Sequence, residues 1–373
     1  VRETVQASLS EAERSARYGE LVHALRDRDE PELLSRCLEM VGELEQAGHH
    51  AALAAERAFS ALAFERAVEL YRRALQLAPA TSDRSTLLTR SGQALENAGR
   101  ALEAAGVYQA AAKLTDIQGG LDLKRRAAEQ LMVSGRISEG AALLREVCKA
   151  LDLRLPRKNS EAFLSIAWSQ LRLRLRSPER PSAEILAVAR EPLSPAVALR
   201  MRCLRSAVTG LIGFLPVQAT AIAGVYLLEA YACRDPVELL RASGFQAHLM
   251  CMRNPDGPRV AALFAQLDRL VEREQRPELV GFARLMHGTA AYCREQYADA
   301  RRHFAVGRSA LQQGSGANWW EVDSTQIYDQ MSAFYCGDYA DISRTTPALL
   351  DEALRRGRAW SLAMLSGFAG MPA

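Results

Sequence analysis

Hydrophobic and polar residues alternate along most of this chain with the period of an α-helix. In the segment ALAFERAVELYRRALQLAP, residues 61–79, the apolar positions recur mostly at three- and four-residue steps. This spacing puts them on one stripe of an amphipathic helix. The segment also carries a small residue four positions before an aromatic one, Ala67 and Tyr71, and it ends at Pro79. Such a step is typical of the second helix of a repeated two-helix unit, so it predicts further copies of itself.

Further copies follow at a nearly constant period. The small and large positions are occupied by Ala67 and Tyr71, by Ala104 and Tyr108, and by Gly140 and Leu144. Successive copies are 37 and 36 residues apart. The two later copies also have a glycine, Gly99 or Gly135, where the chain turns between helices. These features are typical of tetratricopeptide units, whose helices stack because one unit cannot bury its apolar face alone.

The regular spacing fades in the middle of the chain and then returns. Within residues 156–195 we predict a spacer with one helix, Glu161 to Arg176, that has Trp168 on its apolar side. Looser units resume around Tyr297 and Tyr339, which begin the same Tyr-Ala-Asp motif 42 residues apart. The middle of the chain therefore separates two runs of repeats.

The predicted fold class is all-α, a tetratricopeptide-like α-solenoid in which antiparallel helix pairs form a right-handed superhelix. Three regions are expected: N-terminal repeats at 1–155, degenerate helical repeats with the spacer at 156–275, and C-terminal repeats at 276–373. A last helix from Pro347 to about Gly367 should open a unit whose partner helix is missing. Because the chain starts at Val1 and stops shortly after that helix, we expect it to be part of a longer protein.

Composition agrees with a helical fold and gives no sign of a charged partner. Aromatic residues make up 6% of the chain, and no alternating Val/Ile/Thr run of strand length stands out. The net charge of +3 is close to neutral for 373 residues, and the basic residues are 43 Arg and only four Lys. Neither direct binding to nucleic acid nor binding to a membrane surface is therefore expected.

One uncharged stretch is long enough to cross a bilayer. It contains 23 residues between Arg205 and Glu229. It could be a transmembrane span, or a pair of buried helices separated by the turn GFLPVQAT. The interruption by Gly213, Pro216 and Gln218 favours the helix pair, so no membrane span is predicted. Seven scattered cysteines without a C-x-x-C pair read as reduced core thiols, which favours a cytoplasmic location.

No motif for catalysis, cofactor binding or metal binding is found. Lys124 comes closest to a phosphate-binding loop, but Leu123 stands in place of the required glycine and Arg125 in place of the hydroxyl residue. The loop GSGANW lacks the third glycine of a dinucleotide motif. His287, Cys293 and His303 lie close in sequence, but their spacing does not bring them to one helix face. We therefore predict no catalytic, cofactor or metal residue and no enzymatic activity for this segment, although a Cys/His nucleophile pair cannot be told from core cysteines and surface histidines.

Adjacent tryptophans offer a candidate binding site. Side chains of neighbouring helical residues diverge by about 100°, so Trp319 and Trp320 cannot both face the same core. Either neighbouring repeats hold both of them, or one is an exposed anchor in a docking groove. Tyr328 and the acidic Glu321 and Asp323 lie nearby in sequence. These five residues are the predicted protein-docking cluster.

Three stretches together resemble a known type of repeat region. They are Leu44 to Leu75, Thr209 to Ala242, and Asn318 to Trp360, the last with Trp320, Glu321 and Asp323 in a Trp-Glu-x-Asp element. They are similar to the tetratricopeptide-like region of large bacterial signalling proteins that also carry a Hanks-type serine/threonine kinase domain and an AAA-type predicted ATPase. The middle stretch departs from that pattern at Phe214-Leu215-Pro216. No catalytic residue of the kinase has a counterpart here.

The resemblance implies a non-catalytic scaffold or sensor segment. Its partner would be another protein or the parent's own ATPase and kinase domains, which it would help to regulate. The main alternative is the ligand- or protein-sensing arm of a transcription regulator, or a freestanding adaptor built from similar repeats. An enzyme hidden within the repeats is the third possibility, and it has no motif in its favour.

Overall fold

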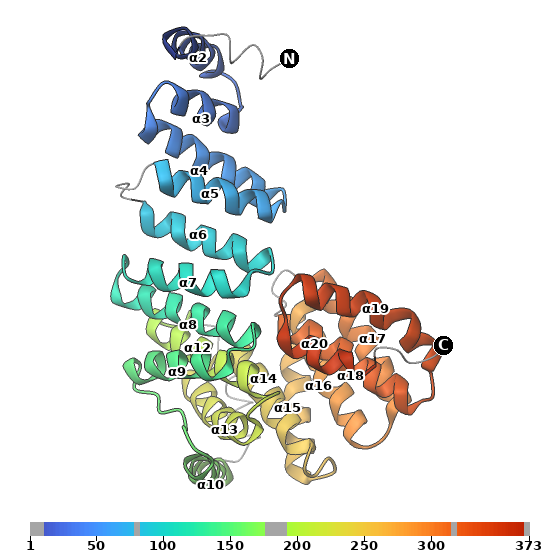
Figure 1. The fold of residues 1–373 in the computed structure, drawn as a ribbon. Coiled ribbons are helices and arrows are strands. Elements are labelled where there is room, and N and C mark those ends of the chain that lie inside the picture. The colour runs from blue at the N-terminus through green and yellow to red at the C-terminus, as the bar shows by residue number, and fades with distance from the viewer. Residues whose placement is uncertain (1–10, 78–82, 176–191, 315–318, 369–373) are drawn as a thin grey trace. The chain divides into compact units, whose positions relative to one another are not determined.

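The computed structural model describes residues 11–77, 83–175, 192–314 and 319–368. These residues form eighteen helices and, within the described ranges, no strand (Figure 1). The all-α prediction is therefore confirmed. Contacts between residues group the chain into two compact units, 1–131 and 132–373. The predicted division at residues 155 and 275 stays a prediction.

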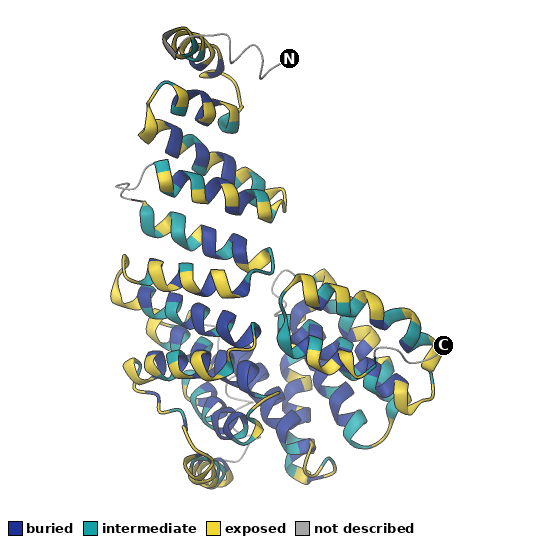
Figure 2. Ribbon diagram, in the orientation of Figure 1, coloured by how far each residue is buried: buried dark blue, intermediate teal, exposed yellow. Residues whose placement is uncertain are grey.

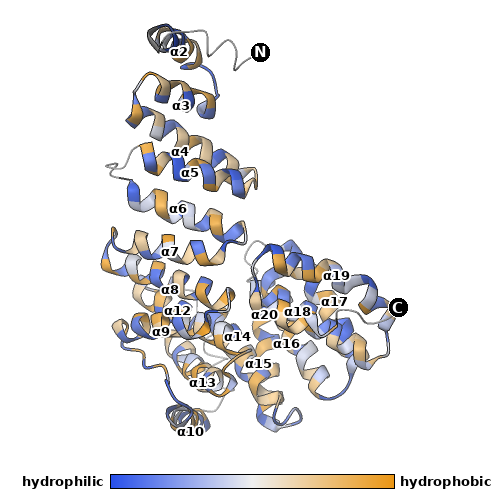
Figure 3. Cartoon of the chain, in the orientation of Figure 1, coloured by the Kyte–Doolittle hydropathy of each residue, from blue (hydrophilic) through white to orange (hydrophobic). Residues whose placement is uncertain are grey.

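The first unit is a stack of helices that pack in sequence order. From α2 to α7, each described helix contacts the next one along the chain. The helices are α2 (Glu11–Leu25), α3 (Pro31–Met40), α4 (Leu44–Ser60), α5 (Phe64–Leu77), α6 (Arg84–Asn97) and α7 (Ala101–Ala112), followed by α8 (Ile117–Val133), which spans the boundary. Figures 2 and 3 show buried and exposed, hydrophobic and hydrophilic residues alternating along these helices, as expected for amphipathic elements.

The second unit contains longer helices that mostly pack in the same way. From α12 to α20 each helix contacts its successor, while α10 packs mainly against α13 and α9 against α12. The helices are α9 (Ile137–Ala150), α10 (Asn159–Leu175), α12 (Pro195–Leu211), α13 (Pro216–Cys233), α14 (Pro236–Cys251), α15 (Pro258–Glu274), α16 (Pro277–Cys293), α17 (Tyr297–Gln313), α18 (Trp319–Tyr335), α19 (Tyr339–Arg355) and α20 (Ala359–Ser366).

The repeat positions inferred from sequence make the contacts between paired helices. Gly92 on α6 lies against Tyr108 on α7: a Cβ on the glycine would be 2.6 Å from Cε1 of the ring. Sixteen residues also separate Gly288 on α16 from Phe304 on α17, and the same contact forms there. A small residue on the first helix therefore accommodates the large residue of the second helix in both units.

Turns between paired helices use a left-handed residue. Gly99 has φ +79° and Gly135 has φ +87°, as their place in the repeats predicts. Leu62 occupies the corresponding position of the first copy and also has positive φ, +60°. The backbone geometry of the turn is thus kept even where the residue is not glycine.

The long uncharged stretch is a pair of helices. The chain turns between α12 and α13, and Pro216 begins α13, where a missing N–H costs nothing. Among the described residues no helix has both the length and the apolar character that crossing a membrane requires.

The predicted last helix was wrong at its start. Pro347 lies inside α19, which continues to Arg355, so it does not open a new helix. The break comes later, at Gly357 with φ +58°, where the Arg358 N–H donates to the Ala353 carbonyl. This is the usual glycine-based end of a helix, and α20 follows it.

Helix α14 forms the centre of the second unit. All but one of its residues are buried, and it contacts α12, α13, α15 and α16. It nevertheless carries polar side chains, among them Arg241, Gln246 and His248. Buried polar groups need hydrogen-bond or ion-pair partners, so the partners of these side chains must lie on the helices around α14 or in a bound molecule.

Candidate functional site

The two predicted anchor tryptophans have different environments. Trp319 is the first residue of α18 and is half-buried. Trp320 is 2% exposed, and its ring centroid lies 5.4 Å from that of Phe245 on α14. The two side chains diverge as expected for helical neighbours, and Trp320 is the one that faces the core.

The acidic residues of the predicted cluster are paired inside the unit. Glu321 forms an ion pair with Arg241 of α14, and both side chains are less than 10% exposed. Asp323 pairs with Arg358 and accepts a hydrogen bond from Ser361 Oγ. These contacts connect α18 to α14 and α20, which is a structural role.

Tyr328 completes the predicted cluster. It is half-buried, with its ring 6.1 Å from His248 and 6.2 Å from Phe304 between centroids. Burial raises the pKa of its hydroxyl. The five predicted residues thus lie on one helix, but only Trp319 and Tyr328 keep part of their surface exposed. Their docking role stays a prediction.

A larger exposed apolar surface lies on α10. Five large side chains there are between 52% and 80% exposed: Phe163, Leu164, Trp168, Leu171 and Leu175. Leu164, Trp168, Leu171 and Leu175 follow one another at steps of four, three and four, so they lie on one side of the helix. Figure 2 shows this helix largely in the colour of exposed residues. We call these five residues the α10 stripe.

The opposite side of α10 is packed. Ala162, Ser169 and Leu173 are buried, and α10 contacts α13. Leu173→Glu would therefore disturb the core, whereas a glutamate in place of an exposed stripe residue, such as Leu164, would not. Apolar residues lie on both sides of this helix.

Positive charge borders the stripe. The Arg172 guanidinium lies 5.9 Å from the centroid of the Trp168 ring, a cation–π contact, and Arg174 follows two residues later. The single acidic residue of α10, Glu161, is at its opposite end and accepts a hydrogen bond from the Arg157 N–H. An apolar surface with a basic end results.

Two of the three residues considered as metal ligands, His287 and His303, are in contact. His287 and His303 stack with ring centroids 5.6 Å apart, and Nε2 of His287 lies 2.7 Å from a carboxylate oxygen of Asp268. The stacking comes from adjacent helices, which sequence spacing within one helix does not reveal. In the part of the chain described here, no group of three His, Cys, Asp or Glu side chains is arranged to hold a metal ion.

No model of a known protein family matches this chain, and no curated protein matches it at a significant level.

Proposed function

We propose that this chain is a helical-repeat scaffold segment that docks a protein partner, and that the α10 stripe is its contact surface. The observation that supports this most is the set of five large apolar side chains exposed on one helix. Contiguous exposed apolar surface in a folded protein marks sites of interaction, and tryptophan is among the residues most enriched at binding hot spots.

The chemistry of the stripe favours one kind of partner. An apolar row at helical spacing is complementary to the apolar face of another helix. Arg172 and Arg174 lie at the C-terminal end of α10 and have no acidic neighbour on that helix turn. The partner expected is therefore an amphipathic helix with acidic residues beside its apolar face.

The resemblance in sequence supports a first partner to test. If the parent carries kinase and ATPase domains, the segment would dock the ATPase domain and so contribute to regulating the attached enzymes. The alternative is a sensing arm of a transcription regulator or a freestanding adaptor. The reading frame around this segment distinguishes the two, because kinase and Walker motifs support the first and a helix-turn-helix supports the second.

Equilibrium binding between this chain and the separately purified neighbouring domain of the parent tests the proposal. Leu164→Glu with Trp168→Glu should weaken binding by at least tenfold, because hot-spot residues contribute about 2 kcal/mol or more each. Leu354→Glu is the matched control, since Leu354 is 67% exposed on α19, outside the stripe. Equal affinity of both variants would exclude the stripe as the contact surface.

A further inference from the structure

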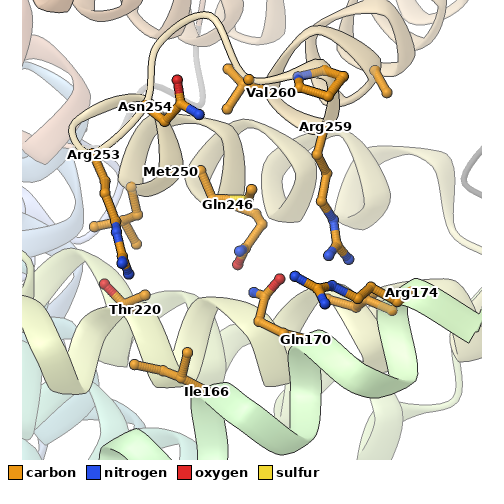
Figure 4. Close-up of a pocket in the computed structure, with 15 residues that line it drawn as sticks. Ile166, Gln170, Arg174, Thr220, Gln246, Met250, Arg253, Asn254, Arg259 and Val260 are labelled. Atoms are coloured by element: carbon orange, nitrogen blue, oxygen red, sulfur yellow. The ribbon is translucent and has the colours of Figure 1, made fainter.

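A pocket in the second unit has the character of a ligand site. It has a volume of about 670 Å³ and is formed by α10, α13, α14 and α15 (Figure 4). This volume lies within the range of about 300 to 1,000 Å³ that is typical of small-molecule sites, which are lined mainly by apolar side chains. Its apolar side chains include Ile166, Leu173, Leu249, Met250 and Val260.

Three arginines line the pocket without a carboxylate to balance them. Arg174 comes from α10, Arg253 follows α14, and Arg259 is in the first turn of α15. None of the three forms an ion pair with a carboxylate in the described ranges, and no Asp or Glu is among the described lining residues. Most of the other described arginines of this unit form an ion pair with an aspartate or a glutamate, for example Arg301 with Asp329.

Two of these guanidinium groups approach each other. Figure 4 shows Arg259 and Arg174 directed toward one another across the pocket, with Arg253 on its other side. Burial and the nearby charge of Arg174 lower the pKa of Arg259. Both effects disfavour a second positive charge here, so an anion between the two arginines would relieve the repulsion.

Gln246 is an independent sign of a missing partner. It is 1% exposed, and neither its amide nitrogen nor its amide oxygen has a hydrogen-bond partner in the structure. Figure 4 shows its side chain directed from α14 into the pocket, toward Gln170 and Arg174. A buried amide without partners costs about 1 to 3 kcal/mol, so its presence is explained if a ligand binds it.

We infer that this pocket binds a small organic anion, with a carboxylate or phosphate head at Arg174 and Arg259 and an apolar body against Leu249, Met250 and Val260. The planar guanidinium forks match the oxygen atoms of either head group. Gln246, which is directed toward Arg174, would donate a hydrogen bond to an oxygen atom of the head group. None of the five side chains of the α10 stripe lines this pocket, and Arg174 lies beside both, so the inference goes beyond protein docking.

Isothermal titration of the whole chain tests the inference with four probes. Phenyl phosphate and benzoate carry the two head groups on the same apolar ring, benzyl alcohol lacks the charge, and inorganic phosphate lacks the ring. We expect at least one of the two charged aromatic probes to bind, more tightly than both benzyl alcohol and inorganic phosphate, and more weakly as salt rises. Whichever charged probe binds better identifies the head group. Absence of binding by both at millimolar concentration, or equal binding of the neutral alcohol or inorganic phosphate, would overturn the inference.

Variants locate the binding in this pocket. Arg174→Gln with Arg259→Gln should weaken the better probe by about tenfold or more, because both charge-assisted contacts are lost. The matched control changes two exposed arginines of α19, Arg344→Gln with Arg355→Gln, and should leave affinity unchanged.

Gln246→Leu separates a ligand role from a structural one. An amide without protein partners adds nothing to the stability of the fold, so this variant should melt at the same temperature as the unmodified chain or at a higher one. It should nevertheless bind the probe more weakly. A lower melting temperature with unchanged affinity would show that Gln246 serves the fold, and would overturn its assignment to a ligand. Affinity that is equal in the arginine pair variant and in its α19 control would overturn the site itself.

Discussion

The ring of Tyr108 packs directly against the Cα of Gly92, at a place where a Cβ would come within 2.6 Å of Cε1. The Tyr108 hydroxyl also donates a hydrogen bond of 2.7 Å to Glu96. Helices α6 and α7 are therefore held at a separation that only glycine permits at this position. The relationship links the repeat pattern in the sequence to the packing in the fold.

Gly92→Ala should destabilise the first unit. The added methyl group overpacks the contact with Tyr108, which costs about 1 to 3 kcal/mol. Gly106→Ala on α7 is the matched control, because nothing lies within 4 Å of its Cβ position. That change should stabilise by about 0.5 to 1 kcal/mol, the usual gain from removing a helical glycine. Urea denaturation of both variants gives the comparison, and equal effects would mean that the helix register is wrong.

Leu62→Gly should stabilise the chain. Leu62 has φ +60° and is 73% exposed, so it carries backbone strain and little packing. Relief of the left-handed conformation gains about 1 to 2 kcal/mol, and the extra freedom of glycine in the unfolded chain offsets about 0.4 to 1 kcal/mol of that. A net gain of about 1 kcal/mol in the free energy of unfolding is expected. Gly99→Ala should shift stability the opposite way, and a loss in Leu62→Gly would contradict this account of the turn.

The two adjacent tryptophans should respond differently to truncation. Trp320→Ala removes a ring that is 2% exposed and should cost about 3 to 5 kcal/mol. Trp319 is half-buried at the start of α18, so Trp319→Ala should cost about 1 kcal/mol or less. If Trp319 is a docking anchor, its variant loses partner binding while the fold survives. Similar losses of stability in both variants would make the pair entirely structural.

The stability of the second unit should fall as the pH drops from 6.5 to 4. His248 is fully buried, and burial lowers its pKa to about 4. In this range the unfolded chain binds a proton at His248 that the folded chain does not, so unfolding is favoured as pH falls. The difference corresponds to about 3 kcal/mol. Denaturation at several pH values measures how far the free energy of unfolding declines. The decline should be smaller for His248→Gln than for His49→Gln, because the His49 side chain is exposed in the unmodified chain. Equal declines in the two variants would refute the role of His248.

The paired helices and their turns could be predicted from the sequence, because they depend on residues that are close along the chain. Small and large residues at fixed steps, such as Ala104 and Tyr108, revealed the paired helices, and Gly99 and Gly135 revealed the turns. Pro347 misled the prediction of the last helix, because proline usually stands near a helix start, whereas α19 accommodates it inside.

The surfaces could not be predicted in the same way. The sequence puts Trp168 on the apolar side of this helix, but apolar residues surround most of α10. In the structure Leu173 is buried, whereas Trp168 and Leu171 are exposed. Only the packing of α13 decides which side is covered. The arginine-lined pocket likewise combines Arg174, Gln246 and Arg259 from three helices, and no spacing within one segment brings them together. Tertiary contacts determine both features.

Photocrosslinking from the α10 stripe is the most direct test of the proposed docking. The probe is p-benzoylphenylalanine in place of Trp168, which is 61% exposed, introduced into the protein in its native cells. We expect crosslinks to an amphipathic helix with acidic residues in another domain or protein, and no such crosslinks when the same probe replaces Leu354. Crosslinks from position 168 that stay within this chain, or that match those from position 354, would contradict the claim that the stripe docks a partner.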